Sequence, residues 1–303
     1  MRIAVFGTGA VGGYFGGRLL AAGEDVSFIA RGTHLAALQS GGLRVTSPKG
    51  NFAVPVTATD DPSTIGPVDV VLLTVKLYDL DAAAVRLAPL IGPDTVVVTL
   101  QNGVEAAGMV SRYVGAEHVA PGSAYVVASI TEPGHIVHTT ADRLVFGETD
   151  GRLSPRLAAF QEAGQRAGYV AELSPRVDVE LWVKFVRLST WSGITSVTRS
   201  SMGAIRQHPE LLALMDRALD EAMAVGRARG IDFPEDVVEG TQKMARNFPP
   251  ESKSSLLVDL EHGRRLELPW LSGAVARMGA ESGVPVPIHT FISTVLLPHQ
   301  NGR

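Results

Sequence analysis

A glycine-rich turn near the start of the chain constrains the fold more than any other feature of the sequence. The motif Gly7-Thr8-Gly9-Ala10-Val11-Gly12 has the pattern G-x-G-x-x-G. The apolar run 2–6 precedes it, and small and apolar residues at helical spacing follow it over 10–22, up to Gly23, which is expected to stop the helix. The motif therefore lies between a predicted strand and a predicted helix.

In a strand–turn–helix of this kind each glycine has a separate task. The first permits the tight turn, the second lets a pyrophosphate approach the backbone, and the third lets the helix pack closely on the strand. The helix N-terminus offers N–H donors to the phosphates. The turn predicts a dinucleotide site, against the alternative of an ordinary glycine turn, and its candidate cofactor-binding residues are Gly7, Thr8, Gly9, Ala10, Val11 and Gly12.

The residue that follows the second predicted strand, 25–30, indicates which dinucleotide binds. Sites for NAD usually carry Asp or Glu near this strand end, where the carboxylate bonds the ribose 2′-hydroxyl. This chain has Arg31 there instead. A guanidinium binds a 2′-phosphate through charge-assisted bonds, whereas a carboxylate repels one. Arg31 therefore favours NADP(H), unless it is an ordinary surface arginine.

The rest of the first half alternates between strand and helix signals. Continuous β-branched runs at 68–75 and 95–100 are typical of strands buried on both faces. Between them, 79–90 reads as a helix capped by Asp79, and 33–39 reads as another short helix. Alternation of this kind predicts a mostly parallel, doubly wound sheet of the Rossmann type. Shorter and more irregular strands, with antiparallel edges among them, are expected at 43–56 and 136–146.

The second half changes to long helical patterns. Ser174 and Pro175 read as an N-cap and first helical residue of a helix that runs to about Thr195. Further helices are expected at 209–229, 254–261, 267–282 and 288–297, with Gly230 and Gly283 as stops. The sequence thus predicts an α/β chain with two domains, a nucleotide-binding domain over 1–172 and an all-helical substrate and catalytic domain over 173–303.

Composition excludes several classes of function. The 27 Lys and Arg against 31 Asp and Glu among 303 residues give a net charge of −4, which supplies no basic field for nucleic acid or for an anionic membrane surface. The chain has no Cys, which excludes disulfides and thiolate metal sites and fits a reducing compartment, and its histidines show no metal-ligand spacing. The apolar runs are far shorter than the ~20 residues of a spanning helix. Without a signal-peptide pattern, a cytoplasmic location is expected.

Polar residues follow two neighbouring predicted strands at the point where each strand ends. Lys76 comes directly after 68–75, and Gln101-Asn102-Gly103 comes directly after 95–100. Ligands of doubly wound sheets bind at the carboxyl ends of the strands, so Lys76 and Asn102 are candidate site residues. A solvated loop lysine and an ordinary Asn-Gly turn are the alternatives.

Lys184 interrupts an apolar stripe in the helix that begins at Pro175. Val177, Leu181, Leu188 and Trp191 repeat there at helical core spacing, and Lys184 falls on the same face. Burial of an ammonium is costly and lowers its pKa, so Lys184 is a candidate proton donor. The alternative is that the aliphatic part of the Lys184 side chain packs against the apolar residues while its ammonium group reaches water.

Two residues nearer the C-terminus are ambiguous on their own. Glu267 is expected in a first helical turn beside Pro269, where a carboxylate most often serves only to complement the helix dipole. Ser255, in the pair with Ser254, reads either as a cap or as a donor to a ligand.

Together these motifs resemble the ketopantoate reductase (2-dehydropantoate 2-reductase) family over nearly the whole chain. The matching features are the glycine turn, Lys76, Gln101-Asn102-Gly103, the run 133–138, Leu181-Trp182-Val183-Lys184, and the C-terminal run from Ser254-Ser255 to Leu266-Glu267-Leu268. The spacing of W-x-K, the serine pair and the glutamate is specific, whereas the glycine motif alone is not.

The resemblance implies an activity and a role for each matching residue. Hydride would pass from NADPH to the ketone carbon of a 2-oxo acid, giving a 2-hydroxy acid of the pantothenate and coenzyme A pathway. Lys184 matches the general acid of the family, and Glu267 the residue that orients the substrate hydroxyl and that lysine. Asn102 and Ser255 match contacts to substrate oxygens. Lys76 matches a position that lines the cleft near the cofactor, which makes it a candidate for binding both substrate and cofactor. Asn102 also matches a position near the cofactor, and Arg31 matches the 2′-phosphate contact.

One departure from the family pattern concerns the substrate. Asparagines are usual four and eight residues beyond the lysine, where this chain has Leu188 and Ser192, and a further family asparagine aligns near Met202. Their loss leaves a small 2-oxo acid other than ketopantoate as an alternative substrate. A non-catalytic NADP-binding sensor is a second alternative, against which Lys184 and Glu267 argue. The oligomeric state is left open, a homodimer included.

Overall fold

A ten-stranded, mostly parallel sheet organises the first part of the chain in the computed structural model, which describes all residues 1–303. The strand order is β4-β3-β9-β8-β7-β6-β1-β2-β5, and β10 pairs with β9. Antiparallel pairing occurs only between β3 and β4 and between β8 and β9. The strands are β1 (Arg2–Phe6), β2 (Asp25–Ile29), β3 (Leu43–Thr46), β4 (Phe52–Val54), β5 (Thr57–Thr59), β6 (Val70–Leu73), β7 (Val96–Thr99), β8 (Val119–Glu132), β9 (His135–Phe146) and β10 (Val170–Leu173).

The predicted fold class is confirmed, because strands end at Leu173 and helices alone follow. The α-helices are α1 (Ala10–Ala21), α2 (Gly32–Gly41), α3 (Leu80–Ala84), α4 (Ala106–Val114), α5 (Pro155–Arg166), α6 (Val177–Thr198), α7 (Met202–Arg206), α8 (Pro209–Ala228), α9 (Val237–Asn247), α10 (Ser255–Glu261), α11 (Ser272–Ser282) and α12 (Pro287–Leu296). None of these helices combines the length and the apolar character needed to cross a membrane.

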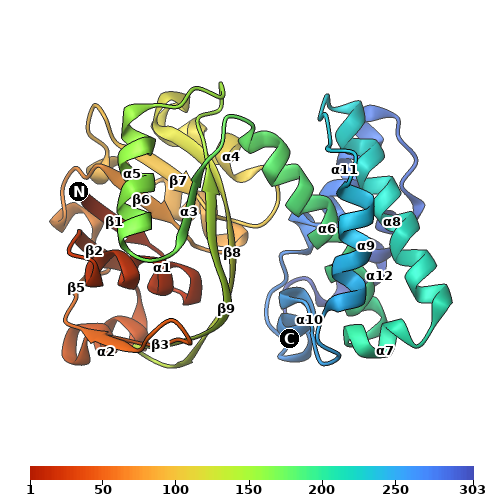
Figure 1. Ribbon diagram of the computed structural model, residues 1–303, viewed down its shortest axis with the longest axis horizontal. Coiled ribbons are helices and arrows are strands. Elements are labelled where there is room, and N and C mark those ends of the chain that lie inside the picture. Colours follow the sequence, from red (N-terminus) through yellow and green to blue (C-terminus); the bar gives the residue numbers. More distant parts are fainter. The chain divides into compact units, whose positions relative to one another are not determined.

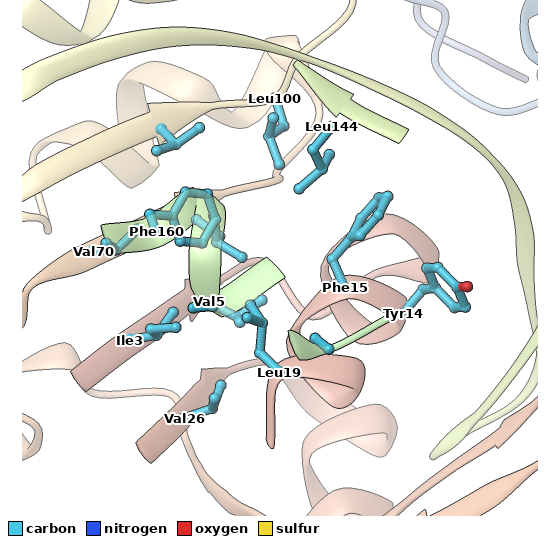
Figure 2. Packing of buried hydrophobic residues seen from close by; sticks show 14 of the residues in the cluster. Ile3, Val5, Tyr14, Phe15, Leu19, Val26, Val70, Leu100, Leu144 and Phe160 are labelled. Carbon is cyan, nitrogen blue, oxygen red and sulfur yellow. The ribbon is translucent and has the colours of Figure 1, made fainter. Parts of the chain in front are cut away.

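The chain divides into two compact units, each with its own core (Figure 1). The first unit comprises Met1–Gln101 and Glu105–Val177, and the second comprises Asn102–Val104 and Asp178–Arg303. In the first unit, α1 directs Tyr14, Phe15 and Leu19 into the apolar cluster that the central strands supply, as Figure 2 shows. Burial of these large side chains anchors α1 to the sheet and so holds the glycine-rich turn in place.

Several predicted elements change in extent. The expected helix 79–90 is wrong, because short 3₁₀ turns at Leu77–Asp79 and Ala88–Leu90 flank the five-residue α3. Asp79 makes no side-chain cap there. The helix predicted from Pro175 instead begins at Val177, since Ser174 Oγ accepts from the Arg176 N–H in a tight turn, and it continues to Thr198.

The long hairpin of β8 and β9 was not predicted. Only the second of its strands had been expected, as a short and irregular segment, yet β9 has 12 residues and pairs with β3, β8 and β10. Pro121 and Gly122 in β8 weaken the strand signal, and three register shifts interrupt the pairing. The additional pairing of β9 with β3 and β10 therefore stabilises a strand that the local sequence signals only weakly.

Candidate functional site

The three glycines of the turn have the geometry that a dinucleotide site requires. Gly7 has φ +98°, which favours glycine. A Cβ on Gly12 would lie 2.6 Å from the Gly7 carbonyl oxygen and 2.8 Å from Val5 Cγ1, so only glycine lets helix and strand approach this closely. A Cβ on Gly9 would meet only the Gly7 oxygen, at 4.0 Å. The space above Gly9 is therefore open, as close approach of a phosphate requires.

The N-terminus of α1 is uncapped beside this open space. No side chain bonds to it, and the N–H groups of Ala10, Val11 and Gly12 form no backbone hydrogen bond. The Thr8 hydroxyl is 3.1 Å from the Ile29 carbonyl oxygen and donates to it, and the N–H groups of Gly7 and Thr8 donate to the same oxygen. The turn is thus fastened to the end of β2, while the helix keeps unpaired donors that suit an anion.

Arg31 extends into solvent just beyond β2, at the position where a Rossmann-type site contacts the ribose. Its Nη2 atom lies 3.3 Å from Oδ2 of Asp79, the last residue of the 3₁₀ turn after Lys76. Sequence reasoning assigned Asp79 to a helix cap and missed this pairing. The signal that could have found it is topological: β2 and β6 both flank β1, so the segments that follow them leave the same edge of the sheet.

Lys76 and Gln101 occupy the carboxyl ends of β6 and β7. Lys76 is partly buried and directly precedes the turn Leu77–Asp79. The Gln101 side-chain Nε2 donates to the carbonyl oxygens of Leu73 and Val75, at 2.9 and 3.1 Å. Gln101 is therefore a structural link between two strand ends, and the role of Lys76 stays a prediction.

The second unit brings Lys184, Glu267 and Asn102 together. The Glu267 side chain is buried, only 5% exposed, and its Oε2 atom accepts from Asn102 Nδ2 at 3.5 Å. Desolvation lowers the pKa of the partly buried Lys184 to about 8, and the nearby Glu267 carboxylate opposes that shift. The pKa of Lys184 is therefore close to the pH range in which an ammonium group can readily donate its proton.

Glu267 lies outside the α-helix in which it was expected. It precedes a 3₁₀ turn, Leu268–Trp270, and α11 begins only at Ser272. The prediction of a first-turn position in a helix over 267–282 is therefore wrong. A carboxylate so deeply buried needs a charged or hydrogen-bonded neighbour, and Lys184 and Asn102 are neighbours of this kind.

The two serines at α10 have separate environments. Ser254 is fully buried and caps α10, because its Oγ accepts from the Leu257 N–H at 3.1 Å. Its hydroxyl also lies 2.8 Å from Thr195 Oγ1. Ser255 is exposed and takes no part in the cap. Ser254 is therefore the capping residue, and a ligand-binding role for Ser255 stays a prediction.

The positions where the family asparagines are absent offer no replacement donor. Leu188, one helical turn beyond Lys184, packs against the apolar core of the second unit. The Ser192 hydroxyl is buried and donates to the Ser189 carbonyl oxygen at 3.5 Å within α6. Met202 is fully buried in the same core. These three positions are consequently less polar than in the family pattern.

Matches to known proteins extend over almost the entire chain. The family model "Ketopantoate reductase PanE/ApbA" matches residues 3–151, and its C-terminal counterpart matches residues 176–300. The chain is 32% identical to a 2-dehydropantoate 2-reductase of Mesorhizobium japonicum over 95% of this chain and 94% of that one. A 2-dehydropantoate 2-reductase of Archaeoglobus fulgidus is 31% identical over 99% and 98% of the two chains.

Solved structures give the same result. The crystal structure of a PanE/ApbA family ketopantoate reductase from Ralstonia eutropha matches with a TM-score of 0.91 and 32% identity over 99% of this chain and 98% of that one. A D-mandelate dehydrogenase complex with NADH matches with a TM-score of 0.89 over 99% and 98% of the two chains, and at 21% identity it shows a shared fold alone.

Fold, glycine turn and relatives together define a nicotinamide-dependent oxidoreductase with a small-molecule substrate. Within that class the chain belongs to the ketopantoate reductase family and is an enzyme of the 2-dehydropantoate 2-reductase type.

Proposed function

We propose that this enzyme reduces ketopantoate to pantoate with NADPH in the cytoplasm, as a step of pantothenate and coenzyme A biosynthesis. The observation that carries the proposal is the partly buried Lys184, whose pKa is lowered to about 8 beside the buried Glu267 carboxylate. Relatives named 2-dehydropantoate 2-reductase support the choice of substrate.

In the proposed reaction the cofactor, when bound, supplies a hydride to the ketone carbon of the substrate. The carbonyl π electrons become an alkoxide pair on oxygen, and Lys184 donates its proton to that oxygen and is left as a neutral amine. Glu267 keeps Lys184 protonated before the step, because its negative charge favours the ammonium. We assign Asn102 and Ser255 to the substrate oxygens, with Asn102 and Lys76 also near the cofactor.

We assign the cofactor to the first unit, with its phosphates on the turn Gly7–Gly12 and its 2′-phosphate on Arg31. The open face of Gly9 and the unpaired N–H groups of α1 fit a pyrophosphate. The exposed guanidinium of Arg31 fits a phosphate dianion better than a ribose hydroxyl.

The activity itself is tested by following NADPH consumption with ketopantoate and with a panel of 2-oxo acids that lack its hydroxyl. Turnover of ketopantoate in preference to the panel is the expected result. If no 2-oxo acid is reduced, the proposed function is wrong.

A second candidate is a reductase of a different small 2-oxo acid, and Leu188 is the observation that favours it. An apolar side chain at this position cannot bond a substrate hydroxyl, and Ser192 is committed within its helix. The substrate panel distinguishes the candidates, since this one predicts the highest kcat/KM for a 2-oxo acid without a hydroxyl.

Replacing Leu188 by asparagine tests that assignment from the protein side. We expect kcat/KM for ketopantoate to rise by about two- to tenfold, the worth of one added hydrogen bond. Values for 2-oxo acids without a hydroxyl should stay the same or fall. The exposed substitution Lys243→Asn on α9 is the control. Unchanged ketopantoate kinetics would show that other groups recognise the hydroxyl.

Arg31→Ala tests the cofactor assignment. We expect the dissociation constant for NADPH to rise about tenfold to a hundredfold, with NADH affected about twofold or less, because only NADPH carries the 2′-phosphate. Titration of each cofactor by quenching of tryptophan fluorescence gives both constants. An equal loss for the two cofactors would contradict the role of Arg31 as the 2′-phosphate contact.

A further inference from the structure

A carboxylate lies against the guanidinium that we assign to the 2′-phosphate. Arg31 Nη2 and Asp79 Oδ2 are 3.3 Å apart, and the two side chains are 73% and 41% exposed. Asp79 comes from a segment 48 residues further along the chain, at the end of the turn after β6. The pair therefore joins the two loops that follow β2 and β6.

The pairing adds a carboxylate to this end of the proposed cofactor site, and the residues that follow the second strand do not supply one. Sites for NAD place a carboxylate at the end of that strand, where it accepts a hydrogen bond from the ribose 2′-hydroxyl. Here the strand is followed by Arg31, and the tertiary structure supplies the carboxylate from elsewhere. A cation for the 2′-phosphate and an acceptor for the 2′-hydroxyl consequently lie side by side.

We infer that Asp79 is a specificity-determining residue that reduces the preference of the enzyme for NADPH over NADH. This inference rests on the proposed cofactor site. Asp79 competes with the 2′-phosphate for the Arg31 guanidinium, and its negative charge repels the phosphate dianion. The same carboxylate provides an acceptor for an unphosphorylated ribose. NADH should therefore be used with measurable efficiency.

The exposure of the pair sets the size of the effect. Both charges lie in water and are screened by salt, so the pair is weakly held and the guanidinium stays available to a phosphate. Repulsion in water between a carboxylate and a nearby phosphate dianion, reduced by salt, changes affinity by about three- to tenfold. We expect Asp79 to tune cofactor choice by that factor without abolishing the use of NADPH.

The substitution Asp79→Asn tests this inference, because it removes the charge and nearly preserves the shape. The ratio of kcat/KM for NADPH to that for NADH should rise by about three- to tenfold, and the gain should shrink at high salt. Asp79→Glu keeps the charge and should leave the ratio within about twofold of the wild-type value.

Asp81→Asn is the matched control. Asp81 is an exposed carboxylate two residues further on, whose Oδ1 accepts from the Tyr113 hydroxyl at 3.1 Å and lies 3.9 Å from Arg112 Nη2. The same loss of charge there should leave the cofactor ratio unchanged. Thermal unfolding of each variant separates a change of cofactor choice from damage to the fold.

Each outcome decides a separate question. The inference is overturned if the ratio of kcat/KM for NADPH to that for NADH is unchanged or lower in Asp79→Asn while Asp79→Glu keeps the wild-type ratio. A lower ratio in Asp79→Asn would mean that Asp79 positions Arg31 for the phosphate. If Arg31→Ala affects NADPH and NADH equally, the proposed cofactor site fails whatever Asp79 does. If Arg31→Ala discriminates and Asp79→Asn does not, only the inference about Asp79 fails.

Discussion

Replacing Lys184 by alanine is expected to lower kcat by about 10²- to 10⁴-fold, the range that a positioned general acid contributes. Affinity for NADPH should change by about twofold or less, because the lysine acts on the substrate oxygen in the transition state. Steady-state kinetics and cofactor titration on the same preparation measure both quantities. Lys243→Ala, at an exposed position of α9, is the control and should behave as wild type.

The pH profile adds a readout that a structural role for Lys184 would not change. The acid must be protonated, and desolvation lowers its pKa to about 8, so kcat/KM should be constant below that pH and fall about tenfold per unit above it. Lys184→Arg keeps a charge that does not titrate in this range and should also be slow. A cofactor affinity that falls as far as activity in Lys184→Ala would contradict the acid role.

Replacing Glu267 by glutamine is expected to have the second largest effect. Removal of the buried negative charge takes away the interaction that raises the pKa of Lys184, so that pKa should fall below 8 by about one unit. The alkaline limb of the profile should move to lower pH by the same amount. By that shift alone, kcat/KM should fall about twofold at pH 7 and up to about tenfold above pH 8.

The direction of the shift in the pH profile makes the Glu267 prediction specific. A carboxylate that only bonded the substrate would raise KM and leave the alkaline limb in place. Glu239→Gln, an exposed residue of α9, is the matched control and should leave the profile unchanged. An alkaline limb that moves upward in Glu267→Gln would contradict the electrostatic link between the two residues.

Local patterns were enough to predict the glycine-rich turn between β1 and α1 and much of the secondary structure. Gly7, Gly9 and Gly12 are contiguous with the strand and helix that they join, so their conformations depend on neighbours a few residues away. The strands β6 and β7 were predicted for a similar reason, since runs of β-branched residues are typical of strands buried on both faces.

Predictions failed where partners distant in sequence decide the structure. Strand β9 pairs with β3 and β10 as well as with β8, and these partners extend it beyond the short segment expected from the sequence. Asp79 was expected to cap a helix through local bonds, and it pairs with Arg31 instead. Arg31 and Asp79 are 48 residues apart, so their pairing has no signal within a window of a dozen residues.

The sequence by itself determined the α/β and helical halves, the glycine turn, and the candidates Arg31 and Lys184, because periodicity and turn chemistry are local properties of the chain. Only the tertiary structure decided that Lys184 has a lowered pKa, that Glu267 is buried beside it, and that Asn102 donates to that carboxylate. The physical reason is that desolvation and charge pairing depend on groups from elements far apart in the chain, here 82 residues between Lys184 and Asn102 and 83 between Lys184 and Glu267.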